Sequence, residues 1–133
     1  LESPDLLLRG YRLDNPHVQP GDMLSLTLHW QVRQQPQQNY GLHFYLAAEN
    51  ALETPLYLWP VVEPIGGEWP TSQWPAGYWV QDKVDLPVAA DIPPGRYKLG
   101  VALKVPVTGP AAASQPELLG VTHFTLDSVS ISP

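Results

Sequence analysis

The chain contains no cysteine and no long apolar segment. Without cysteine it can form neither a disulfide framework nor a thiolate metal site, and cysteine usage says nothing of its compartment. No stretch approaches the roughly 20 apolar residues of a membrane span, and the N-terminus lacks the basic and apolar regions of a signal peptide. We therefore expect no direct membrane insertion by this chain.

Basic residues are also scarce. Seven lysines and arginines stand against 13 aspartates and glutamates, so the formal net charge is -6. Binding to nucleic acid needs basic side chains clustered against the phosphates, which seven scattered residues do not supply. The sequence therefore excludes a nucleic-acid partner, and we interpret the acidity as a contribution to solubility.

Proline and glycine, in contrast, are abundant, with 16 prolines and 10 glycines in 133 residues. Both residue types interrupt helices, so the composition favours short strands joined by turns. The length fits a single domain over residues 1–133. Because the chain opens Leu1-Glu2-Ser3-Pro4 with no initiator methionine, we expect it to be a fragment of a larger protein.

Three segments, 24–31, 40–47 and 97–104, alternate apolar and polar side chains with the period of two that is typical of strands. The apolar positions of all three should face one core. The expected core residues are Leu26, Leu28, Trp30, Leu42, Phe44, Tyr97, Leu99 and Val101.

Weaker strands are expected at residues 6–13, 56–62, 78–86 and 118–131. In the last of these the apolar positions change from even to odd, which predicts a bulge near Asp127-Ser128. Seven or eight short strands separated by turns predict an all-β, immunoglobulin-like antiparallel sandwich. Residues 108–116, rich in glycine, proline and alanine, are the expected mobile loop.

Two segments carry a distinctive pattern. Pro20-Gly21-Asp22 leads into Leu24-x-Leu26-x-Leu28-x-Trp30, and Trp69-Pro70-Thr71-Ser72-x-Trp74 leads through Asp82 to Pro93-Pro94-Gly95-x-Tyr97. In order and spacing they resemble the β-sandwich appended after the membrane spans of some bacterial glycosyltransferases of the mannosyltransferase type. The resemblance implies an extracytoplasmic module of the cell envelope, with a membrane-anchored parent protein that holds the transferase chemistry.

The chain departs from that family in two places. Trp59-Pro60-Val61-Val62 stands where the family tends to have an acidic residue, and Lys104-Val105-Pro106 replaces a Tyr-Asp-like ending. No site is therefore expected at those acidic positions.

No catalytic constellation is found. The sequence has no nucleophile elbow, and its four histidines show no ligand spacing. The carboxylates near the tryptophan-rich loop, Glu63, Glu68, Asp82 and Asp85, are the only candidates for an acid–base pair, and Asp82 has the parity of the core. We expect no catalytic residue, no metal site and no cofactor.

Asp82 is interpreted as a structural residue. It shares the parity of Val80 and Val84, so we predict that it pins the turn from Thr71 to Trp74 by accepting hydrogen bonds there. A calcium ion held by Asp82 and loop carbonyls is the alternative.

Tryptophan is frequent, and four of the five tryptophans flank one loop. Trp79 shares the parity of polar neighbours and should be the most exposed ring, followed by Trp69. Flat exposed rings can stack on sugars, so Trp69, Trp79 and Tyr78 are the candidate glycan contacts. The alternative is packing, which we expect for Trp30 and Trp74.

The outward positions of segments 40–47 and 97–104 hold several glycines and alanines. A bare sheet face suggests that something lies against it. We predict a protein interface at His43, Tyr45, Gly100 and Ala102, for a partner domain of the parent protein or a second copy. The alternative cover is a terminal strand or loop 108–116. Two functions follow: an accessory interaction module of an envelope glycosyltransferase, or a carbohydrate-binding module.

Overall fold

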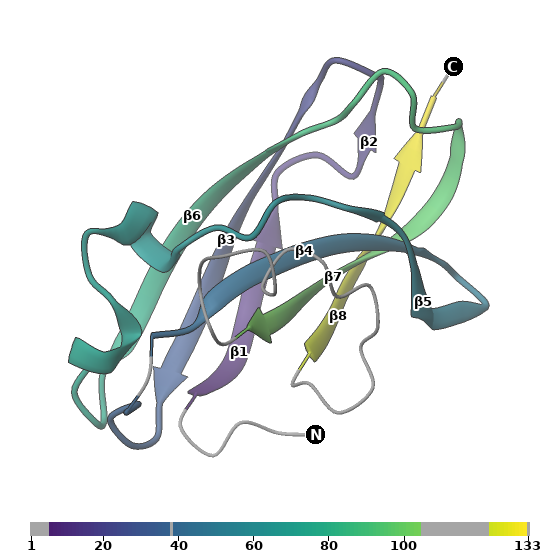
Figure 1. Ribbon diagram of the computed structural model, residues 1–133. Coiled ribbons are helices and arrows are strands. Elements are labelled where there is room, and N and C mark those ends of the chain that lie inside the picture. The colour runs from purple at the N-terminus through teal and green to yellow at the C-terminus, as the bar shows by residue number, and fades with distance from the viewer. Residues whose placement is uncertain (1–5, 38, 105–122, 133) are drawn as a thin grey trace.

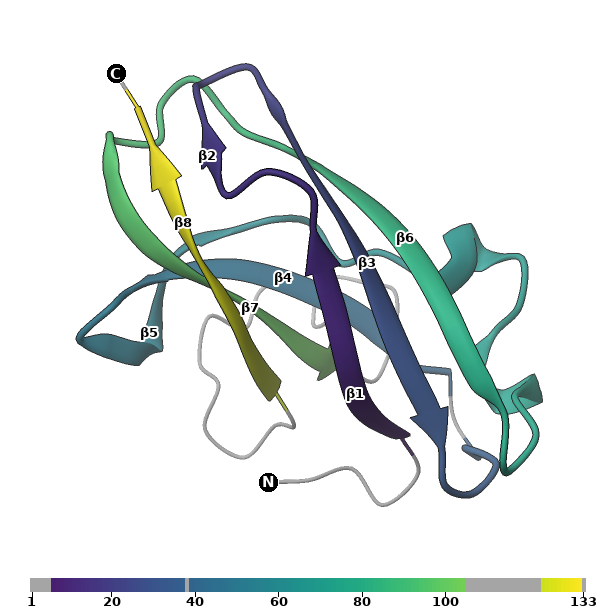
Figure 2. The same ribbon diagram turned by 180° about the vertical axis from the view of Figure 1, so that it is seen from behind.

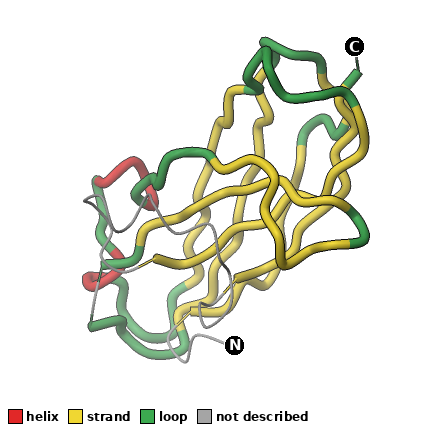
Figure 3. Tube along the Cα trace, turned by 45° about the vertical axis from the view of Figure 1, so that its right-hand side comes forward, coloured by secondary structure: helices red, strands yellow, loops and turns green. Residues whose placement is uncertain are grey.

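The computed structural model describes residues 6–37, 39–104 and 123–132, which form two packed β-sheets (Figure 1). The connection between β5 and β6 contains two short 3-10 turns, η1 and η2, which Figure 3 shows in red on the same side of the molecule. The elements are β1 (Leu6–Leu13), β2 (His17–Val18), β3 (Met23–Val32), β4 (Gly41–Ala48), β5 (Ala51–Leu58), η1 (Pro64–Gly67), η2 (Thr71–Gln73), β6 (Trp79–Pro87), β7 (Gly95–Lys104) and β8 (His123–Ile131).

The strand order confirms the predicted immunoglobulin-like sandwich. One sheet has the order β1-β3-β6 and the other β2-β8-β7-β4-β5. All pairs are antiparallel except the short parallel contact of β2 with β8. The consecutive strands β3 and β4 lie in opposite sheets, and β4 pairs with β7. They correspond in this respect to strands B, C and F of immunoglobulin domains, where B lies in one sheet and C and F lie in the other.

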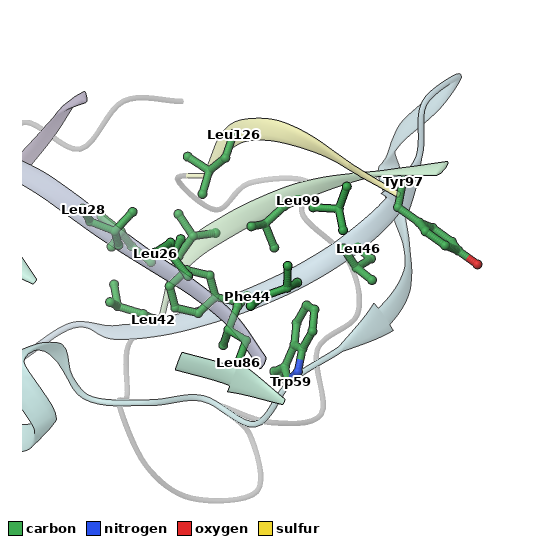
Figure 4. Close-up of a cluster of buried hydrophobic side chains, with 14 of the residues drawn as sticks. Leu26, Leu28, Leu42, Phe44, Leu46, Trp59, Leu86, Tyr97, Leu99 and Leu126 are labelled. Carbon is green, nitrogen blue, oxygen red and sulfur yellow. The ribbon is translucent and has the colours of Figure 1, made fainter. Parts of the chain in front are cut away.

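The core lies between the two sheets, where side chains of β3, β4, β7 and β8 meet (Figure 4). All eight residues expected there are buried. Their positions follow from alternation, since β3 buries every second residue from Leu24 to Val32. Burial of each such side chain contributes roughly 2 kcal/mol to folding.

The bulge predicted in the last strand is present. Lys98 pairs with Ser128 and Gly100 with Thr125, so two residues of β8 stand opposite Leu99. The extra residue reverses the phase of the strand, and Leu126 and Val129 therefore both face the core.

One strand, β5, differs clearly from its expected bounds, and the start of the last strand is not tested. β5 spans residues 51–58 rather than 56–62, and Val62 makes only an isolated bridge to Leu42. In the last strand, β8 begins at His123, and the expected residues 118–122 lie outside the described residues. The loop expected at residues 108–116 lies outside them as well.

Candidate functional site

The outward face of the three-stranded sheet is polar and is arranged in rows across the strands. Thr27 of β3 lies between Arg12 of β1 and Lys83 of β6 in the register of the sheet. In the next row, His29 lies between Gly10 of β1 and Gln81 of β6. The sequence places these side chains outward because each strand alternates buried and exposed residues.

This face is hollowed along β3. The outward side chains of β3 from Ser25 to Gln31 are half-buried, whereas Gln81, Lys83 and Asp85 of β6 are exposed on one side and Arg12 and Asp14 on the other. They enclose a hollow of about 490 Å³, which we call the β3 trough. The trough is lined by Arg12, Asp14, Ser25, Leu26, Thr27, His29, Gln81, Lys83 and Asp85. Figure 2 views this sheet from outside, and no other element of the described chain crosses β3 there.

The charges of the trough are mixed. The Arg12 guanidinium lies 3.5 Å from the Asp14 carboxylate, and both side chains are exposed. Lys83 and Asp85 stand two residues apart on β6, on the same side of the strand. The trough therefore offers hydrogen-bond donors and acceptors along its length, with two cationic and two anionic side chains.

Trp79 stands at one end of this face, where it pairs with Gln31. Its side chain is 60% exposed, as the sequence predicted for the most accessible ring. Alternation along β6 places it on the same side as Gln81 and Lys83. Trp79 does not line the β3 trough; it stands on the same face, one row beyond the His29–Gln81 row at the end of the trough.

The other candidate glycan contacts lie elsewhere. Trp69 is half-buried, with its ring centroid 5.9 Å from that of Trp74 and 6.3 Å from that of Tyr78. Tyr78 itself is 53% exposed. Trp74 is fully buried, and its indole N–H donates to the Trp69 carbonyl over 2.7 Å. The structure therefore brings Trp69 and Tyr78 together in a packed cluster, while Trp79 lies on the sheet face.

Asp82 is buried as predicted, at 2% exposure, but its partner differs. One carboxylate oxygen, Oδ1, accepts a hydrogen bond from the backbone N–H of Ile65 in η1 over 3.2 Å. The Thr71 hydroxyl oxygen instead accepts a hydrogen bond from the Tyr40 backbone N–H, and the Trp74 indole N–H donates to the Trp69 carbonyl. The predicted pin is corrected in this respect, because the chain makes an additional turn, η1, that packs against β6.

The second oxygen of that carboxylate, Oδ2, is buried and has no hydrogen-bond partner within the described chain. Burial raises the pKa of Asp82 to about 6, and the hydrogen bond from Ile65 lowers it in part. The turn that supplies this bond is constrained, since Ile65 and Gly66 both adopt positive φ. Asp82 is therefore a structural residue whose negative charge, when ionised, is unfavourable to folding.

The predicted interface is not exposed. His43, Tyr45 and Ala102 are at most 2% exposed, and Gly100 is buried too. Tyr45, Gly100 and Thr125 form one row across three strands, and a methyl group on Gly100 would overlap the Tyr45 ring. The Tyr45 hydroxyl forms a hydrogen bond with Thr125. The expectation of an exposed patch is therefore wrong: glycine is needed at position 100 because the tyrosine ring crosses it.

We expect Gly100→Ala to lower the free energy of unfolding by about 1–3 kcal/mol, because the added methyl group displaces the Tyr45 ring. In a Tyr45→Val background the same substitution should cost much less. Thermal denaturation of the four proteins of this double-mutant cycle measures the coupling. An equal loss in both backgrounds would contradict the close packing of ring and glycine.

The residues weighed for catalysis do not converge. Asp82 points to the core side of β6 and Asp85 to the trough, so the two carboxylates lie on opposite sides of the strand. His29 and His43 lie in opposite sheets. Among the described residues, no three His, Asp or Glu side chains gather closely enough to hold a metal ion. The same residues include no helix with the length and hydropathy of a membrane span.

Neither protein-family models nor curated proteins match the chain. Among solved structures it is similar to the C-terminal domain of wzt, with a TM-score of 0.59 and 12% identity over 98% of this chain and 75% of that chain. It is also similar to a Niemann-Pick type C2 protein from the Japanese carpenter ant, with a TM-score of 0.59 and 9% identity over 96% and 89%. At these identities the likeness shows a shared β-sandwich fold.

The trough was missed by sequence reasoning, although its parts were visible. The polar phase of residues 25–31 indicated a solvated face, and Gln81 and Lys83 were known to share the parity of Trp79. What joins them is the pairing of β3 with both β1 and β6. Applying the immunoglobulin strand order to the sequence would have placed these side chains on one face.

Proposed function

We propose that this chain is a non-catalytic carbohydrate-binding module that holds a glycan in the β3 trough. The observation that carries this proposal is the position of Trp79, an exposed indole ring that stands one row beyond the polar hollow on the same sheet face. Sugars present apolar C–H faces that stack on aromatic rings, and hydroxyl groups that both donate and accept hydrogen bonds. The Trp79 ring supplies the stacking surface, and the polar side chains of the trough supply the hydrogen-bonding groups.

The same surface suits a protein partner less well. The centres of protein interfaces are depleted in charged side chains, whereas the trough contains four of them. The apolar patch that favoured a partner domain, around Tyr45 and Ala102, is buried in the folded chain. The exposed β3 trough therefore favours glycan binding over the protein interaction that the sequence analysis placed first.

The proposed setting comes from the resemblance to appended modules of membrane glycosyltransferases. In that setting the module lies outside the cytoplasm and holds a glycan close to a membrane-anchored transferase. The residues of the resemblance serve the fold here, since Trp74 fills the sandwich end and Asp82 holds η1. The setting is tested by sequencing the DNA that precedes the coding region of this chain. The proposal requires that this DNA encodes membrane spans in the same reading frame.

Trp79→Ala is expected to weaken glycan binding at least about tenfold, because stacking on the ring is lost while the fold is retained. Titration calorimetry against a panel of purified glycans measures the affinity. Leu56→Ala is the matched control, since Leu56 is also 60% exposed but lies on β5 in the other sheet. Absence of binding to every glycan, or equal affinity of Trp79→Ala and wild type, would overturn the proposal.

A further inference from the structure

The shape and charge of the trough specify the class of glycan further. Resting on the proposed function, we propose that the β3 trough binds an internal stretch of a linear, uncharged glycan that lies along β3. Three features of the described residues carry this: the length of the sheet face that contains the trough, the exposed side chains at both ends of that face, and the balance of charge in the trough.

The trough follows the strand direction. Its floor is formed by Ser25, Thr27 and His29, which are half-buried, and its walls by Gln81, Lys83 and Asp85 on one side and by Arg12 and Asp14 on the other. The β1 residue beside His29 is Gly10, so the trough is open on that side. From Trp79 to Asp85 the face extends roughly 20 Å along β6, at the rise per residue of a strand. This exceeds one sugar ring several times, so the site fits a row of sugar units.

The two ends of this face carry exposed side chains. Trp79 is 60% exposed at one end, and Met23, at the start of β3, is 54% exposed at the other. No described element crosses the sheet at either position (Figure 2). A polymer can therefore continue past both ends, which a site for a chain terminus would prevent.

The charges cancel across neighbouring rows. Arg12 and Lys83 flank Thr27, while the following row pairs Ser25 with Asp85, and the Asp14 N–H donates to the Ser25 carbonyl. For a polyanion, attraction to Arg12 and Lys83 is offset by the two carboxylates of the trough, and the chain as a whole carries a net charge of -6. Hydroxyl groups, in contrast, can donate to the carboxylates and accept from the cationic groups. The arrangement therefore favours uncharged sugars.

The test measures affinity of the wild-type chain for two series of oligosaccharides, from disaccharide to hexasaccharide. One series is uncharged and linear, built of mannose or glucose, and is used with free and with reduced ends; the other is galacturonate. We expect affinity for the uncharged series to rise with length and to survive reduction of the end. Galacturonate should bind about tenfold more weakly or worse at low salt.

A substitution in the trough tests the charge argument. Asp85→Asn should improve galacturonate binding severalfold, whereas Asp91→Asn, which removes an exposed carboxylate outside the trough, should not. Length-independent binding, or a wild-type preference for galacturonate that Trp79→Ala abolishes, overturns this inference and leaves the proposed function standing. If no member of either series binds, this inference is overturned, and the glycan panel described for the proposed function decides that function separately.

Discussion

Acidification from about pH 7 to about pH 4 is expected to stabilise the fold through Asp82 by about 2–3 kcal/mol, because burial raises the pKa of this carboxyl from 3.8 to about 6. The folded chain binds this proton more tightly than the unfolded chain does. The contribution of Asp82 is therefore complete below about pH 4, falls as the pH rises through about 6, and is then level. Most carboxylates in proteins act in the opposite direction.

The Asp82→Asn substitution isolates the pH-dependent contribution of Asp82 to the free energy of unfolding. The amide oxygen keeps an acceptor for the Ile65 N–H but carries no charge, so the variant should lose the pH dependence that is due to Asp82. Urea denaturation of both proteins across this pH range gives the difference in free energy of unfolding. As the pH rises, the free energy of unfolding of the variant should increase relative to that of the wild type. A difference that is constant with pH would show that Asp82 titrates normally in the folded state.

Leu99→Ala is expected to lower the free energy of unfolding by about 2–5 kcal/mol. Leu99 is 1% exposed on β7 at the centre of the five-stranded sheet and packs between the sheets (Figure 4). Shortening it removes apolar contacts and leaves a cavity that neighbouring strands cannot close fully. The midpoint of urea denaturation should fall, and far-ultraviolet circular dichroism should still show a β-protein.

The exposed Leu56 provides the comparison, because Leu56→Ala makes the same chemical change at a 60% exposed site. That variant should stay within about 0.5 kcal/mol of wild type. A similar loss of stability in both variants would mean that the core does not lie where the structure places it.

The binding proposal rests on a face that differs in kind from the motif-bearing end of the molecule. The Trp69 and Trp74 rings and the buried Asp82 stabilise the sandwich end, and they explain why these residue types occur together. The trough consists of ordinary strand residues such as Thr27 and Gln81. A distinctive sequence pattern in this chain therefore marks the fold, whereas the proposed ligand contacts lie in unremarkable strand positions.

The sequence by itself determined the fold class and most of the core. A period of two in three strong segments assigns each side chain to one face, and this assignment depends only on the local backbone. It correctly placed Trp30, Phe44 and Leu99 inside, Trp79 outside, and a bulge in β8 where the apolar phase changes.

Tertiary structure alone decided which outward positions are exposed to solvent and which residues meet. Alternation gives His43 and Thr27 the same outward direction, yet His43 is buried while Thr27 lies in the open trough. It also could not show that the Tyr45 ring crosses Gly100 or that Asp82 reaches Ile65. These contacts join residues distant in the chain, and a periodicity of two residues carries no information on pairs that only strand pairing and loop packing bring together.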